Sequence, residues 1–131
     1  MCDLVTENGK NLCYNESIKH INMMEAMTMA VINVKSANFE KEVLRSKQPV
    51  LLDFFATWCM PCKMLTPIIN EIDKQYKDVK VCKIDIESEP ELAQCFRVMS
   101  IPTLVYIKDG AVVNQSVGFR DKEAIQRMLE D

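Results

Sequence analysis

The sequence predicts an α/β protein with a mixed central sheet of about five strands flanked by about four helices. Short apolar runs typical of strands alternate with segments of helical periodicity over residues 31–131. The last two apolar runs are separated by Asp109-Gly110, a strong hairpin signal. The alternation favours parallel crossovers, whereas a hairpin is antiparallel. A mixed sheet with helices on both faces therefore follows.

The first predicted elements are a short strand and a helix. Residues 31–34 form a brief apolar stretch, which we expect to be the first strand. Ser36 or Asn38 can cap a following helix that turns three apolar side chains inward, namely Phe39, Val43 and Leu44.

The middle of the chain predicts a strand, a long helix and a second strand. Val50–Phe55 is an apolar run after Pro49, the pattern of a strand buried on both faces. A helix is predicted from about residue 59 to residue 76, because apolar residues recur there at helical spacing: Ile68, Ile69, Ile72 and Tyr76. Residues 79–86 are the next predicted strand.

The last part of the chain predicts a short helix, the hairpin and a final helix. Residues 89–96 read as the short helix, with Pro90 tolerated in its first turn. Residues 103–107 and 111–117 are the hairpin strands. Asp121 can cap the last helix, whose apolar face carries Ala124, Ile125, Met128 and Leu129.

Length and charge restrict the class of protein. A chain of 131 residues suits one domain, and its 48% hydrophobic and 27% charged residues are typical of a globular protein. The net charge is −3 and no long basic tract occurs, so we expect neither nucleic acid nor membrane as a partner. No segment reaches the ~18 consecutive apolar residues of a membrane span.

The first thirty residues differ from the rest of the chain. Residues 1–30 show no sustained apolar period, and we interpret them as a flexible N-terminal extension ahead of a domain over residues 31–131. The alternative is a leader that docks on the domain through Met23, Met24 and Met27. The opening residues are acidic rather than basic, so a secretory signal is not predicted and a cytoplasmic location is expected.

The chemistry lies in one pair of cysteines. Of the six cysteines, only Cys59 and Cys62 have the Cys-x-x-Cys spacing. They follow a predicted strand and begin a predicted helix, where the chain meets the carboxyl edge of the sheet. Unsatisfied backbone N–H groups and the positive end of the helix dipole favour a thiolate at Cys59. Cys62 has already entered the helix and is expected to be more buried. Cys59 is therefore the expected attacking thiolate and Cys62 the resolving thiol.

Two other readings of the pair stay open at this point. A Cys-x-x-Cys pair can be half of a zinc site, but the sequence offers no second pair at such spacing, and the only histidine is His20. The pair can also be inert, although the strand–loop–helix context argues against it. We expect no metal and no bound cofactor.

The remaining four cysteines receive separate interpretations. Cys82 lies in a predicted strand and is expected to be a buried small hydrophobe. Cys95 is expected to be buried on its short helix, with regulatory oxidation as the alternative. Cys2 and Cys13 are read as unpaired thiols of the extension, with a regulatory role as the alternative.

Several separated stretches of residues 31–131 resemble the thioredoxin family. They occur in the family's order and are 53–63 (DFFATWCMPCK), 83–86 (KIDI), 100–103 (SIPT), 109–110 (DG) and 117–118 (VG). The resemblance implies the thioredoxin fold and the reduction of protein disulfides. It also implies disulfide-containing protein substrates and recharging by a thioredoxin reductase. We expect the protein to be a monomer.

The resemblance also implies roles for individual residues. Asp53 matches a buried carboxylate below the resolving cysteine, Lys83 the lysine that neighbours it, and Pro102 a cis-proline that faces the dithiol. A further set matches the rim that receives substrate segments: Trp58, Ile86, Ile101, Pro102 and Gly118. Met60 lies between the cysteines and is expected to contact substrate as well. Met60 departs from the family's usual glycine between the cysteines, which leaves the redox potential open.

The residues themselves support part of this assignment. Asp53 is the only charge within Val50–Phe55, and burying an isolated carboxylate costs at least several kcal/mol unless it is protonated or paired. Such a group is a candidate proton acceptor with a raised pKa. The alternatives are an aspartate at a strand end that reaches solvent and, for Lys83, a surface lysine extending from its strand.

Two other functions remain as alternatives. A disulfide isomerase or oxidase would need an oxidising compartment. A binding subunit with this fold would act through its surface, but the chain keeps Cys59, Cys62, Asp53 and Lys83, which favours redox chemistry.

Overall fold

The computed structural model describes residues 31–130, and the predicted N-terminal extension lies outside them. In chain order the elements are β1 (Ile32–Asn33), η2 (Glu40–Leu44), β2 (Val50–Phe55), α2 (Met60–Gln75), β3 (Lys80–Asp85), α3 (Pro90–Cys95), β4 (Thr103–Lys108), β5 (Ala111–Val117) and α4 (Lys122–Glu130). The predicted elements are all present, and β2 and β5 have the predicted bounds.

The strands form one mixed sheet in the order β1-β3-β2-β4-β5. β3 runs parallel to both β1 and β2, whereas β4 is antiparallel to β2 and to β5. The predicted α/β class and mixed five-stranded sheet are therefore confirmed. β2 lies at the centre of the sheet, with two strands on each side of it.

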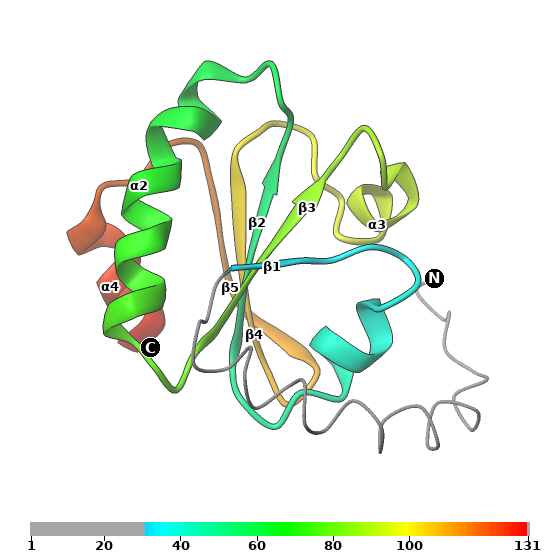
Figure 1. Cartoon of the computed structure of the whole chain (residues 1–131), viewed down its shortest axis with the longest axis horizontal. Helices are drawn as coiled ribbons and strands as arrows, with labels where there is room; N and C mark the ends of the chain where they lie inside the picture. The colour runs from blue at the N-terminus through cyan, green and yellow to red at the C-terminus, as the bar shows by residue number, and fades with distance from the viewer. Residues whose placement is uncertain (1–30, 131) are drawn as a thin grey trace. The chain divides into compact units, whose positions relative to one another are not determined.

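Helices cover both faces of the sheet (Figure 1). α2 and α4 pack on one face, where Leu51 of β2 joins a core cluster with Leu65 and Ile69 of α2 and with Ile125 of α4. The opposite face is covered by η2 and α3.

Aromatic rings fill the core on the η2 and α3 side. The ring centres of Phe54 of β2 and Phe96 are 5.5 Å apart, with the rings tilted by 53°, and Phe96 meets Phe39 edge to face at 5.9 Å. Phe54 and Phe39 are fully buried. Burial of each such side chain contributes roughly 1.5–3 kcal/mol relative to exposure, so β2 is fixed from both faces.

The hairpin turn and the cap of the last helix are formed by the residues that the sequence predicts. Asp109 and Gly110 both have positive φ, 51° and 79°, the left-handed conformation that a two-residue hairpin turn needs. Asp121 accepts a hydrogen bond from the backbone N–H of Ala124 at 2.9 Å, and therefore caps α4. No helix within residues 31–130 is long and apolar enough to cross a membrane.

The predicted cap of the first helix is wrong. η2 is a five-residue π-helix, and no side chain caps it. Asn38 instead accepts from the backbone N–H of Lys35 at 2.7 Å. Both the backbone N–H and the hydroxyl of Ser36 donate to Glu89, which lies directly before α3. Because these hydrogen bonds engage the side chains of Asn38 and Ser36, neither side chain caps the helix. Glu89 is far from Ser36 in the sequence, so the local pattern could not identify it as a partner.

Candidate active site

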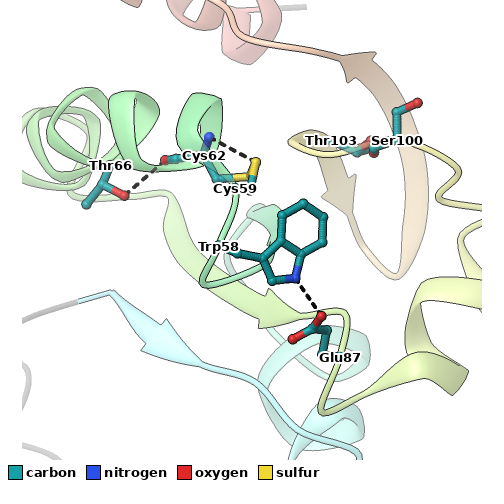
Figure 2. Close-up of a disulfide and its surroundings, with 7 residues drawn as sticks. All are labelled: Trp58, Cys59, Cys62, Thr66, Glu87, Ser100 and Thr103. Atoms are coloured by element: carbon teal, nitrogen blue, oxygen red, sulfur yellow. Dashed lines mark hydrogen bonds between the residues drawn. A yellow bond between two sulfur atoms is a disulfide. The ribbon is translucent and has the colours of Figure 1, made fainter.

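Cys59 and Cys62 are joined by a disulfide at the start of α2 (Figure 2). β2 ends at Phe55, and the short loop after it leads to Cys59, which is the N-cap residue of α2. Their Cα atoms are 5.3 Å apart. The backbone N–H of Cys62 donates to the sulfur of Cys59 at 3.2 Å. The helix start therefore holds Cys59 sulfur where an N–H group and the helix dipole stabilise negative charge.

The expected difference in burial between the two cysteines is wrong for the disulfide form. Cys59 and Cys62 are each 4% exposed. The bond draws both sulfurs together, and partly buried side chains pack against the pair: Phe55, Ile86 and Ile101. The two cysteines differ instead in their backbone position, because Cys59 caps the helix and Cys62 lies within it.

A loop before β4 forms one side of the site. Ile101 packs against the cysteine pair, and the Ile101–Pro102 peptide bond is cis, as the resemblance implies. The hydroxyl of Thr103 donates to the carbonyl of Ser100 at 2.6 Å across this turn (Figure 2). The carbonyl of Pro102 accepts from the backbone N–H of Gly118 at 2.8 Å. Gly118 has φ of 94°, a conformation that favours glycine, so backbone geometry explains why glycine occupies this position.

Exposed apolar side chains lie next to the cysteines along the chain. Trp58 and Met60 are each 64% exposed, and the indole N–H of Trp58 donates to the carboxylate of Glu87. Glu87 was not among the predicted site residues, and its only signal in the sequence is its place directly after Ile86. Met64 and Met99, which are 58% and 90% exposed, were likewise not predicted. Met64 lies one helical turn after Met60, and that spacing was a usable signal.

The side chain of Asp53 is buried on the face of the sheet that α2 covers. It is 1% exposed, which excludes an aspartate that reaches solvent. Side chains alternate along a strand, so Asp53 shares the face of Leu51, which packs against α2. Its Oδ1 atom has no hydrogen-bond partner among the described residues. Burial raises the pKa of Asp53 from 3.8 to about 6, and the charge of Lys83 opposes part of that rise.

Lys83 is the residue opposite Asp53 in the neighbouring strand. The β2–β3 register pairs the two directly, and their side chains lie on the same face. Lys83 is partly buried, and its ammonium lies 4.5 Å from the centre of the Phe55 ring, a cation–π contact. The lysine is thus held beside the site by an aromatic ring and is not a fully exposed surface residue.

The other cysteines within residues 31–130 lie outside this arrangement. Cys82 is fully buried in β3, and burial raises the pKa of its thiol to about 12, so it stays a thiol at neutral pH. Cys95 ends α3 and is partly exposed, so it is less buried than expected. Cys2 and Cys13 lie outside the described residues. In the described part of the chain, no three histidine, cysteine or carboxylate side chains gather closely enough to hold a metal ion.

The geometry suits dithiol–disulfide exchange. Two cysteines share one bond at a helix start, next to exposed apolar side chains, and the strand that leads to them carries a buried carboxylate. A thiolate at Cys59 can attack a foreign disulfide, and Cys62 is close enough to close the ring again.

Comparisons with known proteins point to the same chemistry. The family model Thioredoxin matches residues 30–131. A thioredoxin of Mycobacterium tuberculosis is 46% identical over 110 residues, which cover 83% of this chain and 95% of the relative. A thioredoxin of Bacillus subtilis is 45% identical over 102 residues, 77% of this chain and 96% of the relative.

A third relative joins two proteins in one chain. The bifunctional thioredoxin reductase/thioredoxin of Mycobacterium leprae is 45% identical over 101 residues, 76% of this chain and 22% of the relative. The family match, the redox disulfide and the mixed sheet agree, and the protein is a dithiol–disulfide oxidoreductase that reduces substrate disulfides through Cys59 and Cys62. The chain belongs to the thioredoxin family.

Proposed function

We propose that Cys59 is the attacking thiolate and Cys62 the resolving thiol. The observation that carries this assignment is the N-cap position of Cys59, whose sulfur accepts the Cys62 N–H. The Cys59 thiolate attacks one sulfur of a substrate disulfide, and the other substrate sulfur leaves as a thiolate. Cys62 then loses its proton and attacks the Cys59 sulfur. The second substrate thiolate leaves, and the Cys59–Cys62 disulfide remains.

Asp53 is the group that receives the proton of Cys62. Its burial and its pKa of about 6 support this role, because a base with that pKa is ionised at neutral pH and poised for proton transfer. Lys83 is a positioning residue in this proposal. Its positive charge favours the ionised carboxylate, since it lowers the pKa that burial raises.

Substrate segments bind in an extended form over the rim of the disulfide. Ile86 and Ile101 flank the sulfurs, and Trp58 and Met60 offer exposed apolar surface beside them. Pro102 and Gly118 join the two strand ends at the other side of the site through their backbone hydrogen bond. An apolar rim around a buried disulfide favours unfolded or extended polypeptide over small polar disulfides.

The proposed electron source is a thioredoxin reductase, and the substrates are proteins with disulfides. The Mycobacterium leprae relative carries both names in one chain, which supports this pairing. We propose that the protein acts as a cytoplasmic monomer without a bound cofactor. Residues 31–131 form its catalytic domain and residues 1–30 an extension of it; the family match from residue 30 onward supports this division.

The direct test measures activity and redox potential together. With NADPH and a thioredoxin reductase, the protein is expected to reduce the disulfides of insulin. Equilibration with glutathione is expected to give a potential closer to the value of about −270 mV of a reductant than to the value of about −180 mV of an isomerase. A protein that leaves insulin intact would instead be a binding subunit, and a potential near the isomerase value would indicate an isomerase or oxidase.

Met60 is expected to influence the potential. It is the residue that directly follows Cys59, inside the ring that the disulfide closes, and its side chain is 64% exposed. Met60→Gly removes that side chain and loosens the helix start. We expect the potential to shift by on the order of 10 mV or more in glutathione equilibration.

The matched control is Met64→Gly, which makes the same change one turn later, outside the ring. It is expected to leave the potential at the wild-type value. Equal potentials for Met60→Gly and the wild-type protein would mean that the residue between the cysteines is silent here.

A further inference from the structure

A hollow lies between β5 and α4. Its volume is about 320 Å³. β5 contributes Asn114 and Ser116, and the segment into α4 contributes the remaining lining residues: Arg120, Ala124, Arg127 and Met128. None of these residues belongs to the disulfide, its rim or the Asp53–Lys83 pair. A hollow of this size is large enough for a small ligand.

Three polar side chains of this hollow, those of Ser116, Arg120 and Arg127, have no partners within residues 31–130. The exposed guanidinium groups of Arg120 and Arg127 form no hydrogen bond or ion pair with other described residues. The hydroxyl oxygen of Ser116 is buried and likewise lacks a partner there. Buried hydroxyl groups without a partner are uncommon, and each raises the question of what it binds.

Nearby charges are already engaged or do not reach the arginines. Asp121 caps α4 through the N–H of Ala124, and Lys122 pairs with Glu71 at 3.2 Å. Glu123 lies one turn before Arg127 on α4 but forms no ion pair with it. The hollow therefore keeps two positive charges that the described residues do not neutralise.

The chemistry of these groups selects a doubly charged oxyanion. A guanidinium presents N–H donors in a planar fork that matches a phosphate or a carboxylate. Two guanidinium groups match the two negative charges of a phosphate group better than the single charge of a carboxylate. A staggered rotation about χ1 can turn the Ser116 hydroxyl toward such a ligand. Ala124 and Met128 add an apolar wall for the rest of a small molecule.

We propose that the hollow between β5 and α4 binds a phosphate group, either free or carried by a small phosphate monoester. Arg120 and Arg127 supply the charge-assisted hydrogen bonds, and Ser116 supplies a neutral one. The proposal is independent of the redox chemistry, since the lining residues take no part in it.

The test is a titration of the full chain, followed by backbone amide NMR, with inorganic phosphate and separately with adenosine monophosphate. Ionic strength is held constant with sodium chloride. Saturable shifts are expected at Ser116 and Arg127. Tighter binding of the nucleotide would assign the site to a monoester. Equal binding would assign it to the phosphate group alone. Shifts that grow linearly with both compounds would overturn the proposal.

Variants distinguish a site from general attraction by positive charge. Arg120→Gln and Arg127→Gln are each expected to weaken phosphate binding by about tenfold, the loss of one strong charge-assisted contact. Lys122→Gln removes a positive charge from the first residue of α4, between the two arginines in sequence, but Lys122 does not line the hollow, and we expect less than about a twofold effect. An equal loss for all three variants would contradict the proposal.

Ser116→Ala separates binding from a purely structural role. Removal of a hydroxyl that has no partner is expected to leave the melting temperature unchanged or higher. It is also expected to weaken phosphate binding. A variant that melts earlier and binds phosphate as before would assign the serine to the structure alone.

Discussion

Replacement of Cys59 by serine is expected to abolish insulin reduction, and replacement of Cys62 by serine is expected to trap substrate. Cys59 caps α2 and receives the N–H of Cys62, so its thiolate is the stabilised nucleophile. A serine hydroxyl at that position cannot attack a disulfide at neutral pH. Without Cys62, attack still occurs, but the mixed disulfide between Cys59 and the substrate has no internal thiol to open it.

The measurement is non-reducing gel electrophoresis and mass spectrometry after mixing each variant with oxidised insulin. Cys62→Ser should accumulate a covalent adduct, and Cys59→Ser should not. Cys82→Ser is the matched control, because that thiol is fully buried in β3 and its pKa of about 12 keeps it protonated. Release of substrate by Cys62→Ser at the wild-type rate would show that the assigned roles are wrong.

Asp53→Asn is expected to slow resolution of the mixed disulfide by at least about tenfold near pH 7, because the proton acceptor of Cys62 is lost. In the wild-type protein the rate should rise as the pH increases through about 6, the pKa of Asp53. The variant should lack that rise. Stopped-flow measurement of substrate release from pH 5 to 8 follows both profiles. The same profile in both proteins would remove Asp53 from the mechanism.

The same substitution has an expected effect on stability with a definite sign. The pKa of Asp53 is about 6 in the folded protein and 3.8 in the unfolded reference, so the folded state binds more protons between those values. The free energy of unfolding therefore falls as the pH rises from about 4 to about 6, and it keeps the lower value above pH 6. Asp53→Asn should raise the free energy of unfolding at pH 7 by on the order of 2 kcal/mol.

The stability gain should shrink as the pH falls below 6, where the wild-type carboxyl becomes protonated. Urea unfolding at pH 4.5 and pH 7.5 measures the difference. Asp73→Asn is the control, since Asp73 is a partly exposed carboxylate of α2 outside the site. It should leave the rate of resolution unchanged. Burial also raises the pKa of Asp73, so its removal should change the pH dependence of stability in the same direction but by less, because Asp73 is partly exposed. A gain for Asp53→Asn that is equal at both pH values would contradict the assigned cause.

Local pattern was sufficient for the elements that depend on burial and turn chemistry. The uninterrupted apolar run Val50–Phe55 predicts a strand covered on both faces, and it is the central strand. Asp109-Gly110 predicts the hairpin because few other residues adopt its left-handed backbone. Asp121 predicts a helix start because its carboxylate can reach a free N–H.

Tertiary contacts account for what the pattern missed. Ser36 bonds to Glu89, which is 53 positions away, and so does not cap η2. Equal burial of Cys59 and Cys62 follows from the bond between them and from side chains that other elements supply. The contact between Trp58 and Glu87 depends on the β2–β3 register, which alternation alone does not fix. The hollow beside α4 has no sequence signature, because its arginines resemble ordinary surface charges.

The central place of β2 in the sheet affects how the protein changes between its oxidised and reduced states. Both edges of β2 are hydrogen-bonded to neighbours, and both faces are covered, so its backbone belongs to the part of the fold that opens to solvent most slowly. The reactive ring is attached directly to the end of that strand. Making and breaking one sulfur–sulfur bond can therefore be confined to a few atoms at the tip of a rigid support. A carrier of this kind alternates between its two oxidation states without rebuilding its framework at each turnover.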